Sequence, residues 1–258
     1  MWQHTLEAMR RLDALLGVLG APYDTENGAG NLMLGLATLR LGRYRQQIAE
    51  FLQREFVPGR SLRPLLFFAA LYHDIAKPQT AQFDAEVGRY RFLGHDEQGA
   101  GVTGTRAHAL ALSGDEVKLL RAIVEGHMRP LLFSNDAAAM TARARYRFFR
   151  KYGEAGVAIV LLSLADFWGT YGATLNQADW TRHLDVARAL LETWWEAKDV
   201  QVRPPQLLSG HDLMQVFGLQ PGRELGELLE ALREAQALGE VADREQALAW
   251  VRSKLGEG

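Results

Sequence analysis

The chain has 258 residues with 48% hydrophobic content, no cysteine, and 29 lysines and arginines against 31 aspartates and glutamates, which gives a net charge of −2. This composition excludes a disordered chain, a disulfide framework, a thiolate metal site and a cysteine nucleophile, and it provides no overall attraction to nucleic acid or to an anionic membrane. We therefore expect a folded cytoplasmic protein without a membrane span. Asp166 interrupts its most apolar stretch, 156–169.

Apolar residues recur at three- and four-residue spacing almost throughout the chain, which predicts an all-α fold. The exception is segment 81–92, where Phe83, Tyr90 and Phe92 flank a turn at Gly88 and predict one short β-hairpin. The predicted helices span 3–16, 31–56, 61–75, 97–112, 115–127, 141–151, 154–170, 177–198, 211–217, 222–238 and 244–255.

A domain boundary is predicted in the segment QVRPPQLLSG, which follows a long helix and combines Pro204, Pro205 and Gly210. We expect a helical metal-binding domain with body helices over 1–200 and a small helical tail over 201–258.

The most informative motif is LYHDIAKP, in which an apolar helix runs into His73 and Asp74, then Lys77, and ends before Pro78. An imidazole and a carboxylate are costly to bury unless they are partnered. Further residues of the same two types stand at helix ends or among core residues, namely His4, His95, His127 and Asp166.

Together these side chains predict a centre for one or two divalent transition-metal ions, because imidazole and carboxylate suit manganese, nickel, iron, cobalt or zinc. Such an ion lowers the pKa of bound water from about 15.7 toward about 7, and a pair of ions can clamp a phosphate. Asp74 would bridge two ions, one held by His4, His73 and Asp166 and the other by His95 and His127. Lys77 would neutralise a phosphate oxygen.

Some histidines and motifs have simpler explanations. A lone histidine is usually a satisfied core residue, and His108 and His183 are predicted to lie on polar helix faces. A second His-Asp pair in SGHDLM has the Ser209–Asp212 spacing of a capping box that starts a helix. The glycines of GAGVTG match a dinucleotide-binding pattern, but no strand precedes them, so close helix packing explains them.

A basic stripe in TARARYRFFRKYG is a candidate RNA contact, since its cationic residues share one helix face. A solvated helix face is the alternative, and Tyr146, Phe148 and Phe149 are expected in the core. The stripe consists of Arg143, Arg147, Arg150 and Lys151.

These motifs, in this order, resemble the C-terminal half of bacterial tRNA nucleotidyltransferases and poly(A) polymerases that carry an HD domain. The resemblance rests on LYHDIAKPQT, RYRFLGHDEQGA, EGHMRP, YRFFRKYGEAGVAIVLLSLADFWG and the segment LLSGHDLMQVFGLQPGRELGELLEALREAQALGEVADREQAL. It implies a region similar to metal-dependent phosphatases and 2′,3′-cyclic phosphodiesterases, with the six metal residues above, followed by helices that hold tRNA. The polymerising head of that family needs a Gly-Gly/Ser loop and a D-x-D carboxylate pair. This sequence contains neither, so we expect it not to add nucleotides alone.

Two functions remain open from the sequence. The first is an HD phosphohydrolase that acts on a phosphomonoester or 2′,3′-cyclic phosphodiester of a nucleotide or RNA end, with Asp74 and Lys77 at the reaction centre. The second is a non-catalytic tRNA-binding or partner subunit, which could complete a separate nucleotidyltransferase subunit. The chain could also be a fragment of a longer protein, since its first helix begins so close to His4.

Overall fold

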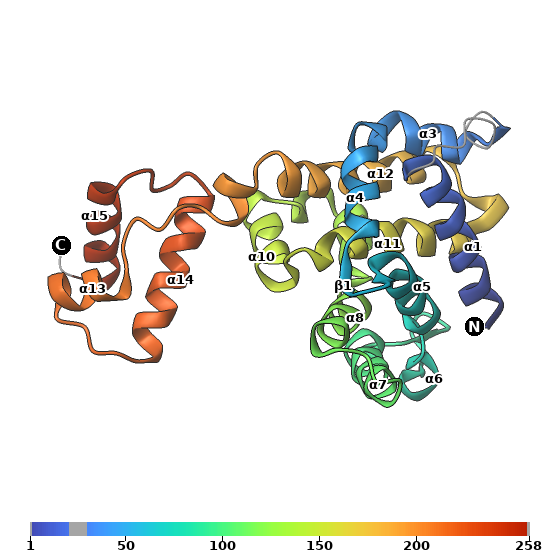
Figure 1. Ribbon diagram of the computed structural model, residues 1–258, viewed down its shortest axis with the longest axis horizontal. Helices are drawn as coiled ribbons and strands as arrows, with labels where there is room; N and C mark the ends of the chain where they lie inside the picture. The colour runs from blue at the N-terminus through green and yellow to red at the C-terminus, as the bar shows by residue number, and fades with distance from the viewer. Residues whose placement is uncertain (1, 21–29, 257–258) are drawn as a thin grey trace. The chain divides into compact units, whose positions relative to one another are not determined.

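In the computed structural model, which describes residues 2–20 and 30–256, the chain is mainly helical with two small antiparallel hairpins (Figure 1). The predicted all-α class is therefore confirmed. The helices are α1 (Trp2–Leu19), α3 (Leu32–Leu41), α4 (Arg45–Gln53), α5 (Leu62–Tyr72), α6 (Lys77–Thr80), α7 (His95–Ala109), α8 (Gly114–Gly126), α9 (Arg129–Asn135), α10 (Ala142–Tyr152), α11 (Ala155–Tyr171), α12 (Gln177–Trp195), α13 (Gly210–Phe217), α14 (Arg223–Ala237) and α15 (Arg244–Leu255). The strands are β1 (Glu55–Val57), β2 (Arg60–Ser61), β3 (Gln82–Asp84) and β4 (Arg89–Arg91).

The chain forms two compact units, which we call the N-terminal unit (1–138 and 152–191) and the C-terminal unit (139–151 and 192–258). The segment 139–151, which contains most of α10, therefore packs with the C-terminal helices. A boundary between residues 200 and 201, as expected from the sequence, would have separated this segment from the C-terminal helices.

Helix α11 is the central helix of the N-terminal unit, where it contacts α1, α5, α8 and α9 (Figure 1). Every side chain from Ala155 to Trp168 is buried, including that of Asp166. By length and composition α11 could cross a membrane, but most of it is enclosed by its neighbours, as in the core helix of a globular unit.

The paired helices α7 and α8 explain two of the three glycines of GAGVTG. A Cβ at Gly104 would lie 2.8 Å from Cδ of Arg121, and one at Gly99 would lie 3.3 Å from Cγ1 of Val124. Close packing, as predicted, favours glycine at these two positions, whereas a Cβ at Gly101 would meet nothing within 4 Å.

The hairpin predicted over 81–92 is confirmed, with Gln82, Phe83 and Asp84 opposite Arg91, Tyr90 and Arg89. The continuous helix predicted over 31–56 is wrong. It is broken by a 3₁₀ turn at Gly42–Tyr44 and ends at Gln53, where β1 begins a second hairpin. Gly59 makes the turn of that hairpin at φ +79°, a conformation that glycine adopts at little cost.

The C-terminal unit has its own small core beneath α13, α14 and α15, built around buried leucines such as Leu213 and Leu232. Ser209 accepts a hydrogen bond from the backbone N–H of Asp212, whose carboxylate accepts one from the N–H of Ser209. The predicted capping box is thus confirmed, and the second His-Asp pair begins a helix.

Candidate metal centre

Three histidines of the N-terminal unit share one local geometry. His73 follows the last turn of α5, His127 follows α8, and His95 begins α7 after Gly94, whose φ of +76° favours glycine. In each of them Nδ1 lies 2.6–2.7 Å from the carbonyl oxygen three residues earlier, those of Ala70, Phe92 and Val124. A carbonyl only accepts, so Nδ1 carries a proton and Nε2 is the nitrogen that faces the interior of the site.

The Nε2 atoms of these three histidines and of His4 lie in two close pairs. His95 and His127 approach to 3.3 Å, and His73 and His4 also approach to 3.3 Å. Two ligands of a tetrahedral ion with bonds of about 2.0–2.1 Å are separated by about 3.3–3.4 Å. The spacing of the paired nitrogens therefore fits shared coordination of a cation.

Asp74 lies between the two pairs. Its Oδ2 is 3.4 Å from Nε2 of His73 and 3.5 Å from Nε2 of His4, and its Oδ1 is 3.5 Å from Nε2 of His95 and 3.8 Å from Nε2 of His127. The carboxylate is 2% exposed, and Oδ1 has no hydrogen-bond partner. A buried carboxylate oxygen without a donor is costly, and a cation would satisfy it.

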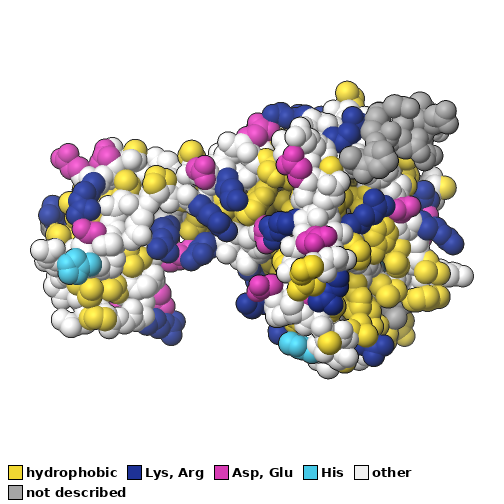
Figure 2. Space-filling model, in the orientation of Figure 1, with side chains coloured by type: hydrophobic (Ala, Val, Ile, Leu, Met, Phe, Trp, Pro, Cys, Tyr) yellow, Lys and Arg dark blue, Asp and Glu magenta, His cyan; other side chains and the backbone are white. Residues whose placement is uncertain are grey.

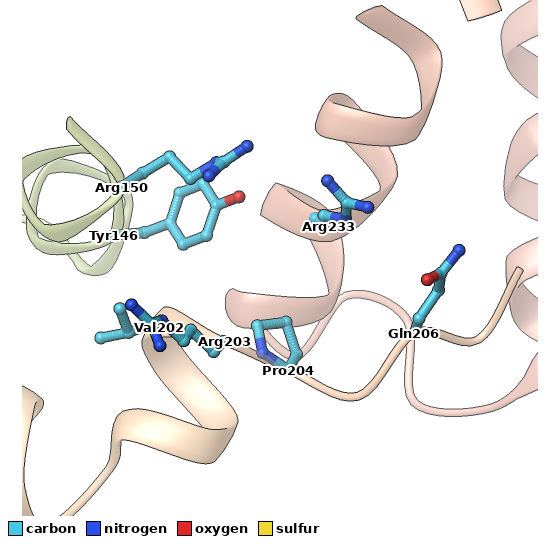
Figure 3. A pocket seen from close by; sticks show the side chains of 7 residues that line it. All are labelled: Tyr146, Arg150, Val202, Arg203, Pro204, Gln206 and Arg233. Carbon is cyan, nitrogen blue, oxygen red and sulfur yellow. The ribbon is translucent and has the colours of Figure 1, made fainter. Parts of the chain in front are cut away.

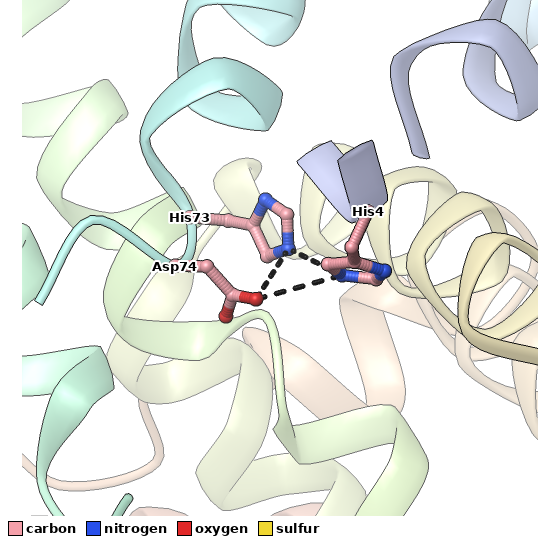
Figure 4. Close-up of side chains that lie close together, drawn as sticks. All are labelled: His4, His73 and Asp74. Atoms are coloured by element: carbon pink, nitrogen blue, oxygen red, sulfur yellow. Dashed lines mark hydrogen bonds and ion pairs between the residues drawn. The ribbon is translucent and has the colours of Figure 1, made fainter. Parts of the chain in front are cut away.

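The donors form two groups that could each hold a metal ion, and Asp74 belongs to both. The first contains His4, His73 and Asp74, which point toward one another in Figure 4, and the second contains Asp74, His95 and His127. Asp166 completes the first group, since its Oδ1 lies 2.9 Å from Nε2 of His4 and 3.4 Å from Nε2 of His73. The structure thus brings together all six residues that the sequence singled out, and this nitrogen and carboxylate set fits a transition-metal ion.

The electrostatics of the centre favour positive charge. Burial lowers the pKa of His73, but its hydrogen bonds and Coulomb attraction to Asp166 and Asp74 prevail and raise that pKa to about 10. Burial acts to raise the pKa of Asp74, yet His73 and Lys77 hold it below its usual range, and His4 and His73 do the same for Asp166. A divalent cation bound here would have to replace the proton that the two carboxylates hold on Nε2 of His73.

His4 reaches the centre because α1 approaches α11 closely. A Cβ at Gly169 would lie 3.0 Å from both N and Cα of Ala8, so a glycine lets the two backbones come together. His4 stands one turn before Ala8 on α1, and Asp166 one turn before Gly169 on α11. The close approach therefore places the two ligands beside each other.

Lys77 lies at the edge of the centre. Its Nζ donates to Oδ2 of Asp74 at 2.6 Å and lies 5.7 Å from the ring centre of Phe92. The Lys77 side chain is partly exposed, at the boundary between the buried carboxylate and solvent.

His183 does not lie on a polar helix face, and that prediction is wrong. It is 1% exposed, with Nδ1 3.0 Å from Oγ of Ser134 and Nε2 3.2 Å from Oγ of Ser163. Burial lowers its pKa to about 4. Its serine partners come from α9 and α11, so spacing along α12 could not reveal them. His108 is exposed, as expected.

The basic stripe of α10 lies in the C-terminal unit, where its arginines pair with carboxylates of α14. Arg143 and Arg147 both contact Glu234, at 2.8 and 2.9 Å, while Nε and Nη2 of Arg150 donate to the two oxygens of Glu230 at 2.6 and 2.7 Å. Lys151 is exposed at the end of the stripe. The expected burial of Tyr146, Phe148 and Phe149 is confirmed.

The same unit contains a cavity of about 400 Å³ with a cationic wall (Figure 3). Arg203 and Arg233 join Arg150 there, beside the hydroxyl of Tyr146, which donates to Glu230 at 2.9 Å. Arg203 and Arg233 could not be identified from the sequence, because they come from separate segments that share no motif. The lining residues are Tyr146, Arg150, Val202, Arg203, Pro204, Gln206 and Arg233.

Comparison of the sequence with known proteins gives a family match and several similar curated proteins. Residues 110–251, more than half of the chain, match the family model of tRNA nucleotidyltransferase domain 2. Similar curated proteins are the A-adding tRNA nucleotidyltransferase of Deinococcus radiodurans (36% identical over 73% of this chain and 41% of that protein) and the CC-adding tRNA nucleotidyltransferase of Thermus thermophilus (37% identical over 71% of this chain and 38% of that protein). The CC-adding enzyme of Geobacter sulfurreducens is 26% identical over 93% of this chain and 47% of its own length.

The chain therefore spans less than half the length of these relatives. The matched residues include His127 and Asp166 and extend into α15. On this evidence, the chain belongs to the tRNA nucleotidyltransferase domain 2 family.

Proposed function

We propose that the N-terminal unit is a metal-dependent phosphohydrolase of the HD type, which acts on a phosphomonoester or a 2′,3′-cyclic phosphodiester of a nucleotide or RNA end. The observation that carries this proposal is the setting of Asp74. Its buried carboxylate lies among four imidazole Nε2 atoms, and its Oδ1 has no hydrogen-bond donor.

In this proposal the six donors divide their roles by position. His4, His73 and Asp166 would hold one ion, His95 and His127 would hold a second, and Asp74 would contribute an oxygen to each. A bound divalent ion would supply an acidified water and polarise a phosphoryl oxygen. The carbonyls of Ala70, Phe92 and Val124 keep the imidazoles in the tautomer that presents Nε2.

Lys77 supplies the fixed positive charge at the edge of the centre. Its hydrogen bond to Oδ2 keeps Asp74 ionised, and its exposed side can attract a phosphate oxygen and offset the charge that develops there. Nitrogen and carboxylate donors of this kind suit manganese, nickel, iron, cobalt and zinc.

Metal analysis of the purified protein, followed by a screen of phosphomonoesters and 2′,3′-cyclic nucleotides with each candidate ion, tests this function. We expect bound metal and hydrolysis, both lost in Asp74→Ala. Undiminished hydrolysis in Asp74→Ala would refute the mechanism, and a protein without metal or activity would favour the second candidate.

The second candidate is a tRNA-binding module that acts without chemistry, either alone or with a separate nucleotidyltransferase subunit. It is supported by the arginine-lined cavity of the C-terminal unit and by the similarity to tRNA nucleotidyltransferases. It predicts tRNA binding that weakens steeply with salt and does not respond to chelators. The role proposed for Arg143, Arg147, Arg150 and Lys151 belongs to this candidate.

A further inference from the structure

Two aromatic side chains stand in solvent on the β3–β4 hairpin. Phe83 and Tyr90 are directly opposite each other in the strand register, with ring centres 5.3 Å apart in an edge-to-face arrangement. They are 60% and 61% exposed. Large aromatic rings in folded proteins are usually mostly buried, so an exposed pair is a candidate contact surface.

This pair is continuous with the candidate metal centre. Phe92 follows Tyr90 by two residues, directly after the end of β4, and is half-buried. The ring of Phe92 lies 5.7 Å from Nζ of Lys77, which donates to Asp74. The carbonyl of Phe92 also accepts from Nδ1 of His95. We call Phe83, Tyr90 and Phe92 the aromatic strip, which leads along the chain from Phe92, beside Lys77 at the edge of the metal centre, to the exposed pair on the hairpin.

The arginines of the hairpin lie on the opposite side of the strands from the two exposed rings. Arg91 pairs with Asp84 at 2.7 Å, and Arg89, opposite Asp84 in the register, is exposed. Because alternate residues of a strand face opposite sides, both arginines lie on the side away from Tyr90. The aromatic strip is therefore apolar, and its residue Phe92 lies beside the ammonium group of Lys77.

A purely structural pair would stabilise the hairpin through its edge-to-face contact. Stabilisation of the hairpin does not require Phe83 and Tyr90 to be exposed to solvent. It also does not require a third ring, that of Phe92, next to Lys77. A flat, partly apolar ligand whose phosphate is held at the centre would meet both conditions.

We propose that the aromatic strip stacks on a nucleobase of the substrate, so that the metal centre acts on nucleotides or RNA ends in preference to phosphate esters without a base. This inference rests on the proposed function and names the substrate class of the same site. Stacking on aromatic rings accepts every base, because each base has a π face. The strip is therefore expected to favour nucleotides without selecting among the four bases.

The test uses the full chain supplied with manganese and the fluorescent nucleotide 2-aminopurine riboside 5′-monophosphate, whose emission is quenched by stacking. We expect quenching with the natural chain and about tenfold weaker binding in the double variant Phe83→Leu/Tyr90→Leu. The matched variant Phe83→Tyr/Tyr90→Phe keeps both rings and should bind within about twofold of the natural chain. Ribose 5-phosphate, measured by calorimetry, should bind equally to all three proteins, which shows that the phosphate site is intact.

Equal nucleotide binding by the leucine and aromatic variants would overturn the inference, as would failure of the nucleotide to bind the natural chain. Loss of ribose 5-phosphate binding together with nucleotide binding in the leucine variant would also overturn it, since the hairpin would then act only by supporting His95. Ring-dependent nucleotide binding without hydrolysis of any ester would refute the proposed function and leave the aromatic strip as a base-binding surface.

Discussion

Nε2 of His4, in the first turn of the chain, lies 2.9 Å from Oδ1 of Asp166, deep in the central helix α11. We expect this contact to depend on the packing one helical turn away, where Gly169 of α11 lets the backbone of Ala8 on α1 approach closely. Gly169 thus links the packing of α1 against α11 to the geometry of the candidate metal centre.

Replacing Gly169 with alanine tests that coupling. The added methyl group would lie 3.0 Å from the backbone of Ala8, and overpacking of this kind costs about 1–3 kcal/mol. We expect Gly169→Ala to lower the free energy of unfolding in urea by this amount and to weaken metal binding. Gly17→Ala is the matched control, because a Cβ there meets nothing within 4 Å. It should leave metal affinity unchanged and stabilise α1 by up to about 1 kcal/mol. Equal metal affinity in both variants would show that His4 does not depend on this packing.

His183 predicts a pH dependence of stability. Its pKa is lowered to about 4 in the folded chain, whereas an unfolded histidine has a pKa of about 6.5. Between these values the unfolded state binds a proton that the folded state does not, so stability is lost as pH falls from about 6.5 toward 4. In urea unfolding with chelator present, the natural chain should lose about 2–3 kcal/mol between pH 7 and 4.5 relative to His183→Asn. A constant difference between the two proteins over that range would mean that His183 is not held neutral.

The arginine-lined cavity gives a prediction for RNA binding. Arg203 is exposed on its wall and contributes a charge that can meet a phosphate. In a filter-binding titration with tRNA, Arg203→Ala should weaken binding and reduce the salt slope by about one. Arg223→Ala removes an arginine that contacts Glu227 in the same unit, outside the cavity, and should have a smaller effect. Identical losses in the two variants would indicate general charge attraction in place of a site at the cavity.

The sequence predicted the features that depend on local pattern. Helical periodicity gave the fold class, and the runs ending in His73 and His127 showed that ligand-type side chains stand at helix ends. The hairpin was predicted from its turn and its aromatic residues. The six candidate ligands could be grouped because all are histidine or aspartate, and not because of their spacing along the chain.

What the sequence could not show depends on contacts between distant segments. The serines that surround His183 come from two other helices, and the carboxylates that pair with the stripe on α10 come from α14. The break in the predicted helix 31–56 also reflects tertiary structure, since β1 pairs with β2 there. Figure 2 shows another feature that depends on packing, a gathering of hydrophobic side chains over α1 and α5.

The most direct test of the metal centre is a calorimetric titration of manganese and nickel into the natural chain, Asp74→Asn and Asp212→Asn. Both variants remove the charge of an aspartate that follows a histidine, but only Asp74 lies among the Nε2 atoms, whereas Asp212 caps α13 and pairs with Arg244. We predict metal binding by the natural chain and Asp212→Asn, and an affinity at least about 100-fold weaker in Asp74→Asn. Equal affinity in all three proteins would contradict the account.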